Sequence, residues 1–219
     1  MEQIADHGNG NFAYIDSAYE AQKVLVQEFG GTLYTIAKDV KLQVEFNPAR
    51  VQAYRLIGYE NRMLAAEDFN DDRKDSGDLG AGHTVTALYE VIPTGVDSGT
   101  PIRGLDELRY QRPDERVALP NSPEMLFVKL RYKDPLGSTS RLLSTAVTDA
   151  DVGPSTDFMF AASVAAFGMV LRDSKYCGAL DLATVLGWAR SSVGLDLEGY
   201  RAEFVGMVEA AQRLSDHSF

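Results

Sequence analysis

The spacing of apolar residues changes once along this chain, and that change constrains the fold more than any other feature. Between residues 38 and 150, apolar and polar residues alternate in short runs, as in half-buried strands. After residue 150, apolar residues recur at helical spacing. The alternating runs predict an antiparallel sheet or small sandwich, and the end of the chain predicts a three-helix subdomain. The expected fold class is therefore α+β.

The turn residues between the runs suggest how the strands connect. Asn47-Pro48 separates the runs 40–46 and 51–59, which predicts a hairpin of these two strands. The remaining alternating runs predict strands at 83–92, 126–132 and 141–147. Prolines crowd residues 93–123, which are expected to form a loop.

The helical end begins with the start signal Pro154-Ser155-Thr156-Asp157. Phe158 to Leu171 is apolar on all sides but shorter than the ~18 residues of a membrane-spanning helix, so a buried central helix is expected. Two amphipathic helices are predicted at 181–193 and 196–214.

The first residues resemble one unit of a larger α/β domain. Phe12 to Ile15 predicts a strand, and Ser17 with Glu20 forms a capping box that starts a helix. Gly30-Gly31 is expected to end that helix. A single strand and helix do not make a domain, so we expect residues 1–37 to be the end of a preceding one.

Composition excludes several classes of protein. The chain has 219 residues, of which 45% are hydrophobic, and a net charge of −11. This charge disfavours nucleic acid as a partner. No apolar run is long enough to span a membrane, and residues 1–20 lack the pattern of a signal peptide. Cys177 is the single cysteine, so no disulfide framework is expected.

An acidic stretch offers the weak candidates for a metal site. Asp68, Asn70 and Asp72 match positions 1, 3 and 5 of an EF-hand loop. However, Arg73 stands where the loop needs glycine, and Leu79 stands where it needs glutamate. We expect a solvated loop, with a weak cation site as the alternative, and assign no metal ligand.

Basic residues and one histidine are candidates for a binding surface. Lys129, Arg131 and Lys133 share the polar face of one predicted strand, where pairing with acidic neighbours is the ordinary role and a partner-binding face is the alternative. His83 begins another strand, and with Glu90 it is the candidate pair for an enzyme. The chain has no Gly-x-Ser-x-Gly motif, and no catalytic or cofactor-binding residue is assigned.

Several stretches carry a resemblance to a known family. The segments GNGNFAYID (8–16) and GGTLYTIAKDVK (30–41) resemble the end of a von Willebrand factor type A domain. A second resemblance is to the C-terminal domain that follows the A domain in one bacterial family. It is found in residues 44–48, 55–62, 68–72 and 80–90.

The resemblance implies a division into three parts: an A-domain remnant (1–37), an antiparallel β domain (38–150) and a helical subdomain (151–219). In that family, the A domain binds a divalent cation at an Asp-x-Ser-x-Ser motif. This motif is absent from the chain, so no cofactor is expected here. The resemblance also implies a location at the cell envelope or outside the cytoplasm.

The resulting expectation is a non-enzymatic accessory domain that acts in protein–protein interaction or adhesion. Exposed strands or the acidic loop would meet a protein partner, and residues 1–37 offer a route to oligomers. One alternative is an enzyme or carbohydrate-binding module with a cleft between sheet and helices. Another alternative is a purely structural brace for the A domain.

Overall fold

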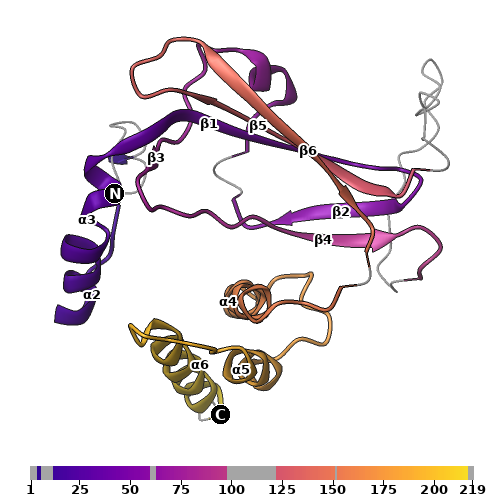
Figure 1. Cartoon of the computed structure of the whole chain (residues 1–219). Helices are drawn as coiled ribbons and strands as arrows, with labels where there is room; N and C mark the ends of the chain where they lie inside the picture. Colours follow the sequence, from indigo (N-terminus) through magenta and orange to yellow (C-terminus); the bar gives the residue numbers. More distant parts are fainter. Residues whose placement is uncertain (1–3, 6–11, 60–62, 98–121, 151, 217–219) are drawn as a thin grey trace. The chain divides into compact units, whose positions relative to one another are not determined.

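The computed structural model describes residues 4–5, 12–59, 63–97, 122–150 and 152–216 (Figure 1). It contains helices and antiparallel strands, which confirms the mixed class, whereas the finer expectation of a sandwich stays a prediction. Most of the predicted loop 93–123 lies outside the described residues. Two compact units are distinguished. The sheet unit comprises 1–54, 60–85 and 91–149, and the helical unit comprises 55–59, 86–90 and 150–219.

The N-terminal segment is helical from α2 (Ala18–Gln22) through the π-helical turn η1 (Lys23–Gln27) to α3 (Phe29–Leu33). The Ser17 hydroxyl accepts a hydrogen bond from the Glu20 amide at 3.0 Å, as the capping box predicts. The strand expected at residues 12–15 is wrong, because these residues pair with no strand in the described chain.

The glycine pair was also misassigned, since Gly30 and Gly31 lie inside α3 instead of ending a helix. A Cβ added to Gly80 would lie 1.5 Å from the carbonyl oxygen of Gly31. The backbones of the two segments therefore approach too closely for side chains, and Gly80 is needed for packing.

The main sheet has the strand order β3-β1-β5-β6. Each neighbouring pair is antiparallel. The strands are β1 (Thr35–Phe46), β3 (Leu79–Gly80), β5 (Glu124–Lys133) and β6 (Ser140–Thr148). The predicted strands at 126–132 and 141–147 are confirmed, and they pair with each other as β5 and β6.

The hairpin expected around Asn47 is wrong, because β2 (Val51–Ile57) pairs with β4 (Leu88–Pro93) in a separate two-stranded sheet. The Asn47 side-chain amide donates to the Glu124 carbonyl at 2.8 Å, and its backbone amide donates to Met125. These bonds hold the turn against β5 instead of folding β2 back onto β1. The strand predicted from residue 83 begins only at Leu88.

Three helices follow the sheet in sequence, as predicted: α4 (Thr156–Leu171), α5 (Leu182–Ser191) and α6 (Tyr200–Asp216). Ser155 and Asp181 cap the first two by accepting from the amides of Phe158 and Thr184. None of the helices in the described chain is both long enough and apolar enough to cross a membrane.

The three helices share one core. Its buried members come from all of them and are Ala166, Phe167, Val185, Leu186 and Val208. The expectation of a wholly buried α4 is therefore wrong, since Phe158, Val164 and Leu171 are exposed. In a bundle of three short helices, each helix buries only one stripe of its surface.

Candidate functional site

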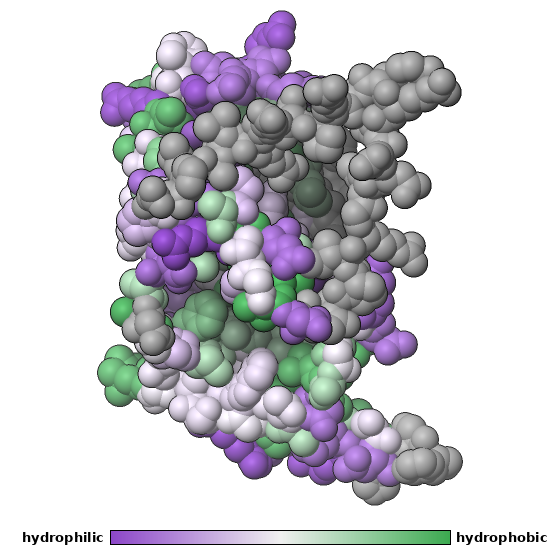
Figure 2. Space-filling model, turned by 90° about the vertical axis from the view of Figure 1, so that its right-hand side faces the viewer, coloured by the Kyte–Doolittle hydropathy of each residue, from purple (hydrophilic) through white to green (hydrophobic). Residues whose placement is uncertain are grey.

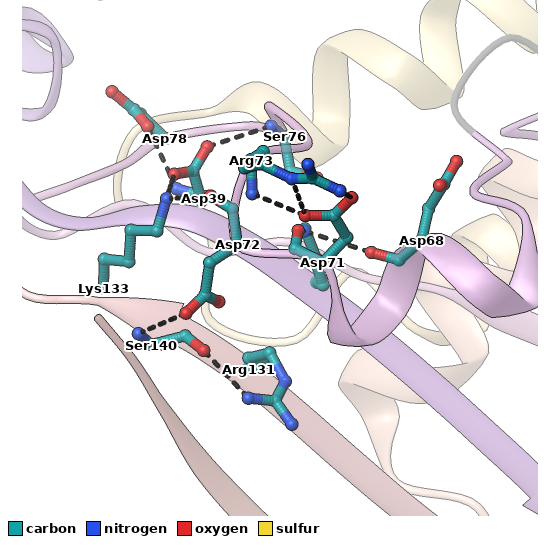
Figure 3. Close-up of polar contacts among 11 residues, drawn as sticks. Asp39, Asp68, Asp71, Asp72, Arg73, Ser76, Asp78, Arg131, Lys133 and Ser140 are labelled. Atoms are coloured by element: carbon teal, nitrogen blue, oxygen red, sulfur yellow. Dashed lines mark hydrogen bonds and ion pairs between the residues drawn. The ribbon is translucent and has the colours of Figure 1, made fainter. Parts of the chain in front are cut away.

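A polar cluster lies in the sheet unit, where the acidic loop (residues 67–78) folds over β1 and β5 (Figure 3). The loop opens with a turn of 3-10 helix, η3 (Ala66–Asn70), which buries the Phe69 ring. The Arg131 guanidinium lies 5.5 Å from the centre of that ring. An apolar anchor therefore fixes one end of an otherwise charged loop.

Lys41 of β1 holds the middle of the acidic loop. Its side chain is buried, with the residue only 3% exposed. The ammonium donates to the backbone carbonyls of Asp68 at 3.2 Å and Asp71 at 2.6 Å. A buried cation needs such acceptors because it has lost its water, so these bonds tie the loop to the strand.

Lys133 of β5 makes the second link. Its ammonium contacts the Asp39 carboxylate at 2.5 Å and the Asp72 carbonyl at 2.7 Å. The hydrogen bond to Asp39 raises the pKa of Lys133. Burial alone would raise the pKa of Asp39, but the bonds from Lys133 and its other partners hold that pKa below its usual value.

Asp39 interrupts β1 and organises the end of the loop. Its φ of 50° is left-handed, and the β1–β5 register shifts between Lys38 and Lys41. The Asp39 carboxylate accepts from the Ser76 amide at 3.1 Å. The hydrogen bond and charge of Asp39 raise the pKa of Asp75, so these two carboxyl groups compete for one negative charge.

The remaining contacts close the network around Ser140. Arg131 donates to the Ser140 hydroxyl at 2.8 Å and to the Asn70 side chain at 3.0 Å. The Asp72 carboxylate accepts from the Ser140 amide at 3.3 Å, and its bonds with Ser140 lower the pKa of Asp72. Arg73 binds Asp71 through two nitrogens, each at 2.9 Å, and lowers the pKa of that carboxyl.

The weak metal candidates Asp68, Asn70 and Asp72 face different partners in this network. Lys41 donates to the Asp68 carbonyl, and Arg131 donates to the Asn70 side chain. The Ser140 amide donates to the Asp72 carboxylate. Within the part of the chain that the structure describes, no three His, Cys, Asp or Glu side chains are grouped so that they could hold a metal ion.

The basic candidates are divided by the structure. Arg131 and Lys133 belong to the network, whereas Lys129 pairs with Glu45 across β1 and β5 at 3.8 Å. His83 is exposed, and its amide donates to Gly80.

Sequence reasoning missed Lys41 and Asp39. The alternating pattern of β1 places Lys41 on a solvated polar face, but in the structure the acidic loop contacts this lysine and the residue is buried.

A second, smaller cluster lies in the helical unit. Arg55 forms an ion pair with Glu90, and its guanidinium stacks 4.2 Å from the centre of the Tyr176 ring. One of its nitrogens lies 3.8 Å from the sulfur of Met169. Glu90, the carboxylate of the predicted enzyme pair, is therefore engaged with arginine.

Apolar side chains at the surface are the other notable feature. On the face shown in Figure 2, hydrophobic residues reach the surface between hydrophilic ones. The N-terminal segment is especially rich in exposed large apolar residues: Phe12, Tyr14, Ile15, Tyr19, Leu25, Val26, Phe29, Leu33, Tyr34 and Ile36. Such a surface on a short helical segment is typical of one that packs against something else.

Comparisons with known proteins place the chain in a longer context. A family model described as "Uncharacterized protein YfbK, C-terminal" matches residues 31–214. Over all 219 residues, the chain is 44% identical to "Uncharacterized protein YfbK" of Escherichia coli (strain K12), and it spans 37% of that protein's length. No solved structure matches the chain.

Proposed function

Because the chain belongs to the family of YfbK C-terminal domains, we propose that it is a non-enzymatic accessory domain of an A-domain protein. Its role is protein–protein interaction or adhesion at the bacterial cell envelope. The A domain and the envelope location rest on the resemblance of residues 8–92, and any divalent cation would belong to the A domain.

The exposed apolar surface of residues 12–36 carries this proposal. It presents large side chains such as Val26, which is 68% exposed, on a segment of only three short helical pieces. Burial of such side chains is the main favourable term in most protein association. The acidic loop, which was also expected to meet a partner, instead has polar groups engaged within the chain by Lys41, Arg131 and Lys133, so the proposal depends on the apolar surface.

A second candidate function, a structural brace for the preceding domain, is favoured by one observation. The family match begins at residue 31, so most of the exposed apolar segment precedes the matched domain. In a longer protein, this segment would then pack against the part of the same chain that comes before it. The surface is the same in both candidates, and only its partner differs.

Site-specific photo-crosslinking in cells distinguishes these candidates. A photoreactive residue replaces Val26 in the full-length protein, and the matched control replaces Leu136, which is fully exposed in the turn between β5 and β6. Crosslinks from position 26 to another envelope protein would support the interaction function. Crosslinks within the same chain would support the brace. Equal and sparse crosslinking at both positions would contradict both.

A further inference from the structure

Strand β6 forms a long edge of the main sheet (Figure 1). It pairs with β5 on one side, and no strand in the described chain pairs with its other side. All its residues except Ser140 are exposed. A strand with one free side presents backbone amides and carbonyls that can pair with a further strand.

The two edges of this sheet differ in their protection. At the opposite edge, β3 has only two residues, and short edge strands resist pairing. In β6, residues 142–148 contain no charged residue, proline or glycine. The register irregularity with β5 falls between Glu124 and Leu126, on the β5 side. Residues 142–148 of β6 therefore carry none of the charges, prolines or strand bulges that block edge-to-edge association.

The side chains of β6 favour association as well. Leu142, Leu143 and Val147 are 48%, 58% and 41% exposed. They lie in the uncharged run 142–148, in which Thr145, Val147 and Thr148 have high β propensity. A second strand beside β6 would cover part of this apolar surface.

The charges at the two ends of β6 identify the strand that fits. Arg141 begins the exposed run and Asp149 follows its last residue. If two copies of β6 run antiparallel and are centred on Thr145, each Arg141 stands opposite Asp149 of the other copy. Leu143 then stands opposite Val147, so apolar residues also meet. A parallel arrangement would instead place like charges together.

From this complementarity we propose that the chain self-associates through β6, with a second copy of the same strand as the partner. Two four-stranded sheets then join into one continuous sheet. Arg141 now contacts Asp134 at 2.7 Å, and Asp149 contacts Arg50 at 3.4 Å, but these pairs are exposed and exchange partners at little cost. The inference goes beyond the proposed function, since it uses a different surface.

The first test measures the dimerisation constant of the full-length protein and of this chain by sedimentation equilibrium. Thr145→Lys places two lysines face to face at the centre of the paired strands, and it should weaken the dimer about tenfold. Ser138→Lys, in the turn before β6, adds the same charge outside the pairing and should leave the constant unchanged. Thermal unfolding of each variant checks that the fold is retained.

A charge exchange provides the second test. Arg141→Asp and Asp149→Arg should each weaken the dimer, and the double variant should restore it. In the double variant, each exchanged residue has the same charge as its neighbour within the copy, Asp134 or Arg50. Restored dimerisation would therefore not come from those contacts. A protein that stays monomeric at all concentrations would overturn the inference. A dimer lost with Val26→Asp but unaffected by Thr145→Lys would also overturn it, and would leave the proposed function standing.

Discussion

Single residues in the sheet unit show that a buried charge can determine the path of a loop. Lys41 donates to two backbone carbonyls of the acidic loop, and Lys133 reaches both Asp39 and the loop backbone. The loop carries many carboxylates, yet the buried Lys41 donates its hydrogen bonds to backbone carbonyls of the loop. The negative charge of the loop is therefore compatible with a fixed conformation.

Replacing the buried lysine should destabilise the chain. Lys41→Met keeps the length of the side chain but removes the ammonium donor from the carbonyls of Asp68 and Asp71, which keep only their backbone donors. We expect a loss of about 2 kcal/mol in the free energy of unfolding, since hydrogen bonds to charged groups contribute about that much. Urea denaturation followed by circular dichroism measures it. Lys38→Met, on an exposed residue of the same strand, is the control, and an equal loss there would contradict the role of Lys41.

The Asp39–Asp75 pair makes a prediction about pH. The pKa of Asp75 is raised by Asp39, so its contribution to stability is fully present below its unfolded pKa, near 4, and is lost as pH rises through the folded value. Asp75→Asn removes the competing charge, and should raise the melting temperature at pH 7. Asp71, whose pKa is lowered, has the opposite sign: Asp71→Asn should lower the melting temperature at pH 7.

Melting temperatures measured from pH 3 to pH 8 give both differences, and each should shrink towards the acid end of the series. Lys133 and Asp78 also face this pair, so the two variants are compared with the parent protein at every pH. If Asp75→Asn lowers the melting temperature at pH 7, the two carboxyl groups do not compete as described.

At the scale of elements, the close approach of α3 and β3 depends on glycine. A Cβ at position 80 would overlap the Gly31 carbonyl, so Gly80→Ala should force the two backbones apart. Overpacking of this kind costs about 2 kcal/mol. Hydrogen exchange should show faster exchange of the α3 amides in this variant. Gly77→Ala, where an added Cβ meets nothing within 4 Å, is the control and should leave α3 unchanged.

The elements also show what the sequence can predict. The caps at Ser17, Ser155 and Asp181 are local signals, because each side chain bonds to an amide three residues away. The partners of β1 are not local. Asn47 was expected to turn the chain back, but it bonds to Glu124, far away in the sequence. Likewise, the site could not be predicted from spacing, since Lys41, Lys133 and the acidic loop meet only after the sheet has formed.

At the scale of the whole molecule, two compact units are distinguished, and the helical unit contains a hydrophobic core of its own residues. The sheet unit contains the acidic loop and the β6 edge, and the helical unit contains the shared core of α4, α5 and α6. Trp188 is the single tryptophan of the chain and packs against the helical core. Its fluorescence therefore reports on one unit, whereas circular dichroism reports on both.

This division predicts two unfolding transitions that can be assigned by mutation. Arg55→Ala removes the ion pair with Glu90 and the stacking on Tyr176. It should lower the free energy of unfolding measured by fluorescence by about 1 kcal/mol. Lys41→Met, in the sheet unit, should shift a transition in the circular dichroism signal and leave the fluorescence transition unchanged. A single transition, shared by both probes and moved by both variants, would show that the units unfold as one. Separate transitions would mean that a partner bound to one unit stabilises that unit alone, since ligand binding stabilises only the folded state that it contacts.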